Sequence, residues 1–424
     1  AAAAWAGWQR SAAPRGNSTS WPDNQQGMTT SIAWLIPKLI EGSGGHRTIL
    51  QHAAALEAAG FECRLYIEPD QHKKGQAAAE IQRLFGYVAR NAVYGWDRIE
   101  PADLVFATVW YSARFVRDLP FPCRKAYFVQ DYEACFNPMG DAYVMAENSY
   151  RYGLHPITIG RWLTQQLRHS FNVPAEHFDF CADLSIYRPL PNVSREKAVC
   201  FIHQPEKPRR CSRLGVEALG IVKNRMPDTR IYLYGSAQKG ELWYPHQDLG
   251  LLKLEDCNAL YNRSAIGLCL SSSNPSRIPF EMMAAGLPVV ELWRDNTLYD
   301  LPQQATLLCD QTPESLAEGI MQLFAAPERR EQMSQAGIEY MRGRPLQLGF
   351  DQFVDSVRRL LAGTANSSVA PVHKLYTRPA LVSHHFERTL PVIGSGKRRR
   401  RKLSGRLAAP FRRAGRFMGK LFTP

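Results

Sequence analysis

The sequence predicts an α/β protein built from two doubly wound domains. From Thr29 onward, short apolar runs alternate with segments of helical periodicity, which is the pattern of parallel strands joined by crossover helices. Residues 184–196 (LSIYRPLPNVSRE) interrupt this pattern with two prolines and several charges, and a second α/β series follows. A length of 424 residues is enough for two domains that each bury a core.

The first series contains five predicted strands and three predicted helices. The first strand leads through a glycine-rich turn into a helix at 46–59, and Gly60 is the residue type that ends helices. The strands are expected at 31–37, 62–67, 103–108, 125–130 and 156–159. The other two helices are expected at 76–89 and 141–152.

The second series repeats the alternation and ends in a helical region. Its strands are expected at 198–203, 230–234, 266–270 and 288–292, and its helices at 212–223, 254–262 and 279–285. Residues 313–361 are expected to be helical throughout. The resulting division is a disordered leader (1–27), a first domain (28–190), a second domain (191–345), a closing helix (346–363), and a linker with a basic amphipathic tail (364–424).

The charge of the chain is concentrated at one end. Eleven lysines and arginines lie in the last 28 residues with no acid among them, and without them the net charge of +13 falls to +2. The body of the protein is therefore close to neutral, which argues against a nucleic-acid-binding body. No apolar run approaches the roughly 18 residues that span a membrane.

The nine cysteines form no C-x-x-C pair and no metal-ligand spacing with histidine. They are expected to be buried thiols in a reducing compartment. No pair of aspartates stands at i, i+2 either, so the sequence offers no D-x-D motif for a cation on a diphosphate. These absences predict neither a metal nor a cofactor.

A glycine-rich turn follows the first predicted strand. Gly42-Ser43-Gly44-Gly45-His46 would let the backbone approach a phosphate or a sugar at a helix N-terminus. Gly44, Gly45 and His46 are therefore candidates for an acceptor or phosphate loop, although the segment is equally a simple tight turn. A dinucleotide fingerprint is excluded because Arg47 occupies the position of its third glycine.

A basic loop follows the first strand of the second series. Lys207, Arg209 and Arg210 come just after the carboxyl end of a parallel strand, where ligands of such sheets bind. Guanidinium groups match diphosphate oxygens, and a lysine adds a point charge. The alternative is a solvated basic loop.

The most informative stretch is S-S-S-N-P-S-R-I-P-F-E-M-M-A-A-G-L-P-V-V (271–290). A strand ends in a polar loop that contains Ser276 and Arg277, and a helix begins near Pro279. Glu281 lies in the first turn, where its carboxylate can accept bonds from ribose hydroxyls. Without a ligand it would be an ordinary first-turn helix acid.

Residues 279–290 (PFEMMAAGLPVV) resemble the signature LEAMACGTPVV of glycosyltransferase family 4, which has the GT-B fold. Three further blocks, IEGSGGHRTI, YFVQDYE and QPEKPRRC, are similar to the WsaF-type rhamnosyltransferases of bacterial surface-glycan synthesis. The resemblance covers residues 30–360 and implies two Rossmann-like domains facing a cleft. It implies a nucleotide sugar in the second domain and a glycan or lipid-linked glycan acceptor at the first.

Several residue roles follow from this resemblance. Lys207 and Arg209 match the basic contacts to the diphosphate, with Arg210 beside them, and Glu281 matches the second glutamate of the E-x7-E motif, which contacts the ribose. Eight residues earlier stands Ser273 instead of the first glutamate, so the sugar is expected to differ from a common hexose, as L-rhamnose from dTDP-rhamnose does. Retention of configuration is the family expectation.

Asp131 and Glu133 follow a first-domain strand and are candidates for contacting or deprotonating the acceptor, with Asp131 preferred. At 100° per residue the last 22 residues separate an apolar from a basic face, the pattern of a helix lying on an anionic membrane. The expectation is a metal-independent glycosyltransferase at the inner face of the cell membrane. The alternatives are a catalytically silent glycan- or nucleotide-binding scaffold, or a nucleic-acid-binding protein acting through its tail.

Overall fold

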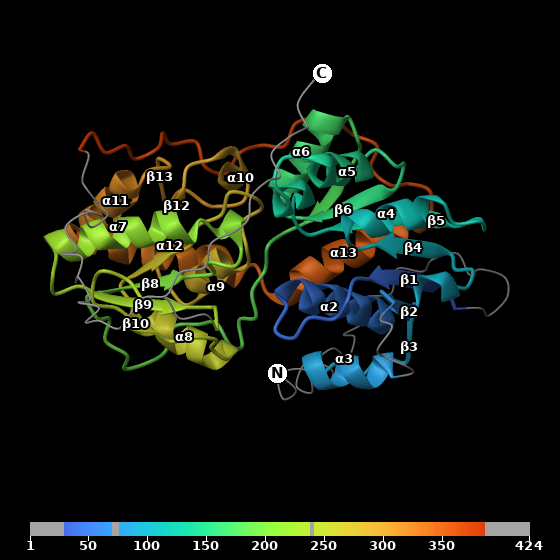
Figure 1. Ribbon diagram of the computed structural model, residues 1–424, viewed down its shortest axis with the longest axis horizontal. Helices are drawn as coiled ribbons and strands as arrows, with labels where there is room; N and C mark the ends of the chain where they lie inside the picture. Colours follow the sequence, from blue (N-terminus) through green and yellow to red (C-terminus); the bar gives the residue numbers. More distant parts are fainter. Residues whose placement is uncertain (1–28, 70–75, 238–240, 386–424) are drawn as a thin grey trace, which may run out of the picture. The chain divides into compact units, whose positions relative to one another are not determined.

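The computed structural model of the protein describes residues 29–69, 76–237 and 241–385 (Figure 1). Within these ranges the predicted α/β architecture is confirmed, with two parallel sheets whose strands alternate with helices. The predicted leader (1–27) and the basic tail beyond residue 385 lie outside the described residues. In the part of the chain that is described, no helix is long and apolar enough to cross a membrane.

The first sheet has the strand order β3-β2-β1-β4-β5-β6-β7, and all of its pairs are parallel. Its strands are β1 (Ser31–Ile36), β2 (Glu62–Ile67), β3 (Asn91–Tyr94), β4 (Leu104–Ala107), β5 (Arg124–Val129), β6 (His155–Ile159) and β7 (Glu176–Phe178). The order reverses between β1 and β4, which makes this the topological switch point of a doubly wound sheet. The turn after β1 therefore lies at the switch point.

We call the part of the chain built around this sheet the first lobe, and the part built around the other sheet the second lobe. The helices of the first lobe connect its strands. They are α2 (Gly44–Ala58), α3 (Ala77–Phe85), α4 (Trp110–Arg117), α5 (Asp141–Ser149) and α6 (Arg161–Phe171), with short 3-10 helices η1 (Trp96–Arg98) and η2 (Glu133–Phe136). The predicted end of α2 is confirmed, because Gly60 has φ +94°. Both α4 and α6 were absent from the prediction.

The second sheet has the order β10-β9-β8-β11-β12-β13 and is also parallel throughout. Its strands are β8 (Ala198–Ile202), β9 (Arg230–Tyr234), β10 (Gln247–Asp248), β11 (Ile266–Leu268), β12 (Val289–Leu292) and β13 (Thr306–Cys309). Its switch point lies between β8 and β11. Because parallel strands all end at one edge, the loops after β8 and β11 are neighbours in space.

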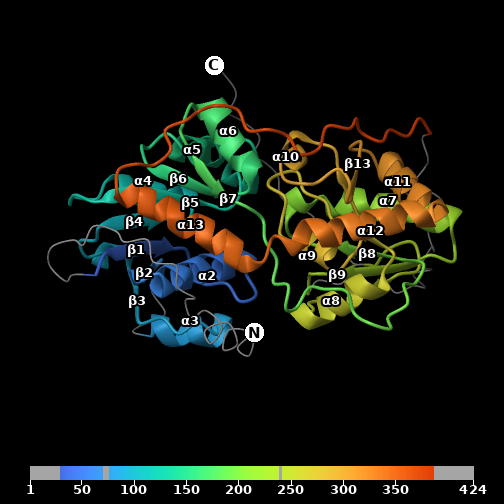
Figure 2. The same ribbon diagram turned by 180° about the vertical axis from the view of Figure 1, so that it is seen from behind.

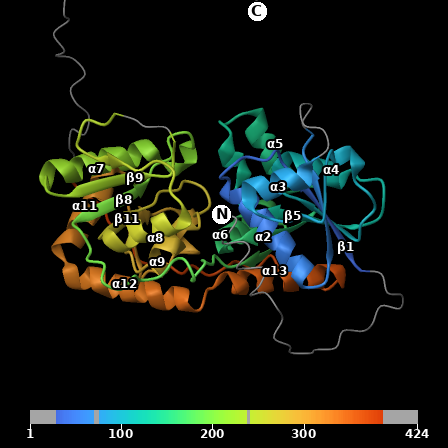
Figure 3. The ribbon, with the colours of Figure 1, turned by 90° about the horizontal axis from the view of Figure 1, so that it is seen from below.

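Side chains of the second sheet alternate between two apolar layers. Along β8, Val199 and Phe201 belong to one cluster, and Cys200 and Ile202 to the other. The surrounding helices are η3 (Pro208–Arg210), α7 (Ser212–Arg225), α8 (Leu254–Arg263), α9 (Ile278–Ala284), α10 (Asp295–Leu298), α11 (Pro313–Ala325) and α12 (Pro327–Arg342). Figure 3 shows α7 on one side of this sheet and α8, α9 and α12 on the other. All nine cysteines are free thiols, as expected, and most of them are buried.

The region 313–361 is helical, as predicted, and short breaks divide it into three helices. Pro327 begins α12, and Pro345 precedes α13 (Leu346–Leu361). Helix α13 packs on α2, β6 and β7 of the first lobe, behind the sheet in Figure 1 and in front of it in Figure 2. Phe353 contacts the rings of Trp34, Phe106 and Phe128 there, so the end of the chain's helical region completes the first core.

Residues 364–385 differ from the predicted linker, because they form an ordered extended segment. Leu381 pairs in parallel with Cys309 at the edge of β13, and its N–H donates to the carbonyl of Leu308 (3.0 Å). Tyr376 is buried and donates its N–H to the carbonyl of Leu298 (2.9 Å). The segment therefore lies on the second lobe instead of forming a free linker. Each of these backbone hydrogen bonds satisfies a polar group that would be hydrated in a free linker.

Candidate functional site

The basic loop and the serine-rich loop meet at the switch point of the second sheet. The basic loop (residues 203–210) follows β8, and the serine-rich loop (residues 271–277) follows β11. The N–H of Ser272 donates to the carbonyl of Arg209 (2.9 Å), and Arg210 Nη1 donates to Ser271 Oγ (2.9 Å). Ligands of doubly wound sheets bind in the crevice at such a point, so the two loops form one candidate ligand site.

Two buried polar side chains hold the serine-rich loop in shape. Glu291 on β12 is fully buried and accepts the N–H groups of Ser271 (3.0 Å) and Leu292 (2.8 Å). Burial raises the pKa of its carboxyl to about 8, against the lowering effect of these bonds and of Arg210. Asn296 donates its amide N–H groups to the carbonyls of Ser271 and Ser273. These bonds therefore fix the conformation of the loop.

The three predicted cations differ in how fully they are engaged. Arg210 bonds to Ser271 Oγ and to the carbonyl of Asn274 (3.4 Å), and Arg209 Nε donates to Asp131 Oδ2 (3.2 Å). Lys207 is about two-fifths exposed, and Glu206 lies 4.0 Å from its ammonium group. Partial burial lowers the pKa of Lys207, opposed by Glu206 and reinforced by the two arginines. Among the three, Lys207 has the fewest contacts to give up for an incoming anion.

Asp131 connects the first lobe to this site. It follows β5, is 6% exposed, and accepts the N–H of Asn274 (2.9 Å) in addition to its bond with Arg209. Asn274 in turn donates its side-chain amide to the carbonyls of Gln130 (3.1 Å) and Ile159 (3.2 Å). The predicted catalytic carboxylate is thus occupied by partners from the second lobe in this structure.

Glu133, the second predicted acid, lies deeper in the first lobe. It is 3% exposed and accepts the N–H of Trp110 at 2.6 Å, at the beginning of α4. Burial raises the pKa of its carboxyl to about 8. A carboxyl with this pKa holds its proton through much of the neutral range.

Glu281 and Arg277 lie together at the start of α9, as the sequence predicted. Burial raises the pKa of the Glu281 carboxyl to about 7, while the charge of Arg277 and a hydrogen bond from the Tyr187 phenol lower it. Arg277 Nη1 donates to Gln51 Oε1 on α2 (3.1 Å), which is a second contact between the lobes. Ser276 accepts the N–H of Ile278 (3.3 Å) and so lies on the same turn.

The glycine-rich turn forms the N-terminus of α2 at the first switch point. Ser43 caps the helix by accepting the N–H of His46 (3.4 Å), and a side chain at Gly45 would contact Gln130 at ordinary distance. Gly42 has φ +72° and therefore needs its glycine. The His46 ring is buried, with its nitrogens near Ser43 Oγ (2.9 Å) and the carbonyl of Pro37 (3.3 Å). Any contribution of Gly44, Gly45 and His46 to a ligand site would come from the backbone.

Sequence reasoning missed the residues that support the site from a distance. These are Gln51, Tyr187, Asn274, Glu291 and Asn296. Asn274 and Tyr187 stood inside segments already singled out, so a polar side chain in a candidate loop was the available signal. Among the described residues no group of three or more histidine, cysteine or acidic side chains is arranged to hold a metal ion.

Comparison with known proteins bears on both lobes. Residues 197–321 match the family model described as the WsaF C-terminal domain. The chain is 27% identical over 375 residues to the O-antigen biosynthesis protein RfbC of Myxococcus xanthus. That alignment covers 85% of this chain and 29% of RfbC, so the chain spans less than a third of this relative.

Solved structures share the fold at low sequence identity. The sucrose-phosphate synthase of Thermosynechococcus elongatus aligns with a TM-score of 0.57 and 15% identity, over 79% of this chain and all of that one. Anabaena HepE, solved in complex with UDP-glucose, aligns with a TM-score of 0.58 and 13% identity, over 77% of this chain and 99% of that one. These matches confirm the predicted resemblance: the chain has the fold of the GT-B glycosyltransferases, and residues 197–321 of its second lobe are similar to the WsaF C-terminal domain.

Proposed function

We propose that the protein is a glycosyltransferase that takes a sugar from a nucleotide sugar and acts in the assembly of a bacterial surface polysaccharide. The observation that carries the proposal is the convergence of the basic loop, the serine-rich loop and Glu281 around the switch point of the lobe that matches the WsaF domain. RfbC, by its name an O-antigen biosynthesis protein, and HepE, solved with UDP-glucose, support the pathway and the class of donor.

In this proposal the diphosphate lies against the basic loop and the N-terminus of α7. Lys207 and the two arginines neutralise the charge that develops on the leaving group, and unpaired N–H groups at the start of α7 add to this stabilisation. Glu281 accepts the ribose hydroxyls. We propose that no metal takes part, because these cations lie where a cation would otherwise be needed and the sequence lacks a D-x-D motif.

On the acceptor side, we propose that the first lobe presents a glycan or lipid-linked glycan to the donor. Asp131 is the candidate for contacting or deprotonating the acceptor hydroxyl, with the backbone of Gly44 and Gly45 nearby at the first switch point. A front-face transfer with retention would ask the protein to position the hydroxyl and to stabilise the leaving group.

The identity of the sugar and the cellular location are finer proposals. We propose L-rhamnose from dTDP-rhamnose, because Ser273 replaces the expected glutamate, and its buried hydroxyl has no partner among the described residues. We also propose that the basic tail holds the enzyme at the inner face of the cell membrane. This follows from the separation of apolar and basic residues in the last 22 positions.

The direct test is a thermal-shift screen followed by turnover. We expect at least one nucleotide sugar among UDP-, GDP- and dTDP-linked donors to raise the melting temperature, because a ligand that binds only the folded state stabilises it. We expect dTDP-rhamnose with a rhamnoside acceptor to release dTDP. A stabilising nucleotide sugar without any transfer or hydrolysis would favour the second candidate function, a catalytically silent scaffold, which the serine at position 273 also favours.

The affinity for a nucleotide sugar should depend on pH through Glu281. Its pKa is raised to about 7, so the carboxylate that accepts ribose hydroxyls is mostly present at pH 8 and mostly absent at pH 6. We therefore expect the Kd to weaken about tenfold as the pH falls from 8 to 6. A nucleotide sugar is the right probe for calorimetry, because its doubly esterified diphosphate has no proton to gain in this range.

Glu281→Gln provides the matched comparison. This variant keeps the shape of the side chain but removes its charge, so we expect weak binding that stays constant between pH 6 and 8. Equal affinities of the variant and the parent protein at pH 8 would remove Glu281 from the nucleotide site. Circular dichroism should confirm that both proteins are folded.

A further inference from the structure

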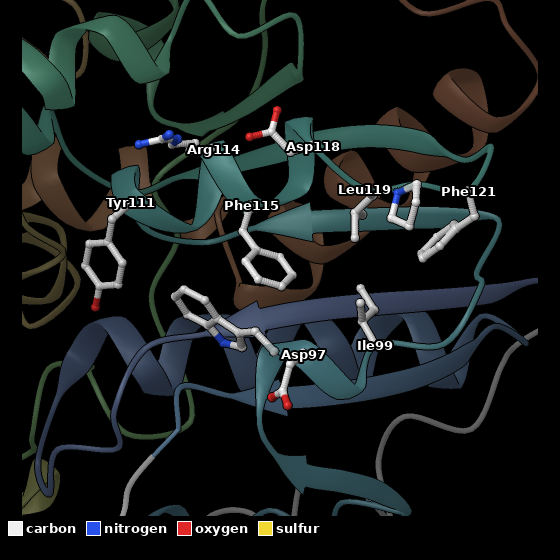
Figure 4. A pocket seen from close by; sticks show the side chains of 10 residues that line it. Asp97, Ile99, Tyr111, Arg114, Phe115, Asp118, Leu119 and Phe121 are labelled. Atoms are coloured by element: carbon white, nitrogen blue, oxygen red, sulfur yellow. The ribbon is translucent and has the colours of Figure 1, made fainter.

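The first lobe carries a pocket that the proposed chemistry does not use. It has a volume of about 420 Å³ and lies between α4 and η1 (Figure 4). Trp96 of η1 and Tyr111 and Phe115 of α4 contribute aromatic rings to it, and Asp97 and Arg114 add charged groups. The pocket is separate from the serine-rich and basic loops of the second lobe, none of whose residues line it.

The aromatic side chains form a fixed platform with accessible edges. Trp96 is 8% exposed, and its Nε1 donates to the carbonyls of Ile36 (3.2 Å) and Tyr66 (3.1 Å). The Tyr111 ring stacks near the Trp96 ring, with centroids 5.7 Å apart, and the Phe115 ring meets it edge-on at 6.0 Å. Tyr111 and Phe115 are each 37% exposed, so they present apolar surface to a ligand.

Three charged side chains line the pocket beside this platform: Asp97, Arg114 and Asp118, of which Asp118 pairs with Arg117. Figure 4 shows Arg114 and Asp97 on opposite sides of the aromatic rings. Both side chains are exposed, and neither forms a hydrogen bond or an ion pair with another described residue. Gly95, two residues before Asp97, has φ +110°, a conformation that favours glycine, so the turn that leads into η1 depends on this residue.

We propose that this pocket binds a sugar residue of the acceptor glycan, away from the hydroxyl that reacts. A pyranose ring has an apolar face of C–H groups, which packs on aromatic rings, and hydroxyls at its edge, which bond to carboxylate and guanidinium groups. The pocket offers both kinds of group within one site of suitable size. The inference rests on the proposed function, because it takes the bound glycan to be the acceptor.

The position of α4 connects the pocket to the reacting end of the acceptor. The helix begins at Trp110, whose N–H donates to Glu133, two residues from Asp131. It then runs for eight residues, about 12 Å. Tyr111 lies in the first turn of α4, the end nearer to Asp131. Its hydroxyl donates to Glu68 (2.8 Å), just beyond the end of β2. A glycan that occupied both places would be longer than one sugar.

The charged groups favour a sugar over the lipid part of an acceptor. A hydrocarbon chain would leave Asp97 and Arg114 without hydrogen-bonding partners and would desolvate them at a cost. Sugar hydroxyls can replace the water around both groups. We therefore assign the pocket to the carbohydrate portion of the acceptor.

Saturation-transfer NMR tests the assignment on the full chain without nucleotide. The probes are methyl α-L-rhamnopyranoside and an O-polysaccharide released from lipopolysaccharide by mild acid. We expect saturation of sugar ring protons with the parent protein, and affinity at least about fivefold weaker in Phe115→Ala and in Arg114→Gln. Val88→Ala is the matched control, because Val88 is an exposed apolar residue of the same lobe outside the pocket, and it should behave like the parent protein.

The outcomes separate this inference from the proposed function. Failure of both probes to bind, or unchanged binding by both pocket variants, would overturn the pocket assignment, while a nucleotide sugar that still raises the melting temperature would leave the enzyme proposal in place. Sugar binding that needs Phe115 and Arg114 in a protein with no affinity for any nucleotide sugar would retain a carbohydrate pocket but refute the enzyme. A changed sedimentation coefficient of Phe115→Ala without any sugar binding would show a protein interface and overturn the assignment.

Discussion

Replacing Lys207 by alanine is expected to lower kcat/KM for the nucleotide sugar by about 100- to 1000-fold. This is the usual size of the loss when one preorganised group that stabilises transition-state charge is removed. Arg209 and Arg210 already bond to Asp131, Ser271 and the backbone, whereas Glu206, at 4.0 Å, is the only ion-pair partner of Lys207 among the described residues. Lys207 is therefore the cation most available to a departing diphosphate, and release of the nucleoside diphosphate measures the effect.

Arg230→Ala is the matched control for this prediction. Arg230 also carries one positive charge in the second lobe, but it begins β9, at the sheet edge opposite the basic loop, and its side chain is 65% exposed and pairs with Glu196 (3.0 Å). Its removal changes the net charge equally and should leave kcat/KM within about twofold, since exposed pairs of this kind contribute little. Similar losses in the two variants would mean that long-range charge, and not a contact of Lys207, governs the rate.

The central strands were predictable from sequence because they are buried on both faces. Runs such as AVCFI (Ala198–Ile202) contain little but apolar residues, and the structure places β8 within one residue of the predicted bounds. Two edge strands, β3 and β10, were missed because they contain no such apolar run. Asn91–Tyr94 alternates exposed and half-buried residues, and Gln247–Asp248 is only two residues long. These segments are strands because a neighbouring strand pairs with them. Such pairing leaves no pattern in the local sequence.

The candidate site was predictable where residues of suitable chemistry directly follow a buried strand. The basic loop and the serine-rich loop each follow a buried strand, and the fold rule alone brings them to the same edge of the sheet. Supporting contacts were not predictable, because they join distant parts of the chain. Asn274 bonds to Gln130 and Asp131 across more than 140 residues, and Glu291 reads in sequence as an ordinary acid at a strand end. Contacts of this kind can be identified only from the folded structure.

Asp131→Asn is expected to lower kcat/KM by about 100-fold, at the lower end of the range for loss of a catalytic carboxylate. The asparagine retains an oxygen for the N–H groups of Asn274 and Tyr132. It presents an amide in place of the oxygen that accepts Arg209 Nε, so Arg209 loses its charged partner. Steady-state kinetics at saturating donor, together with the donor Kd, would show how much of the loss lies in binding.

A double-mutant cycle with Arg209→Ala distinguishes the two ways in which Asp131 can act. If Asp131 works by orienting Arg209 against the diphosphate, its substitution has little left to remove once Arg209 is gone. The two changes should then be coupled by about 1–3 kcal/mol, as residues of one network commonly are. The side-chain contact at 3.2 Å and the burial of Asp131 lead us to expect this coupling. Additive losses in the cycle, with the donor Kd unchanged by Asp131→Asn, would instead identify Asp131 as a base that acts on the acceptor independently of Arg209.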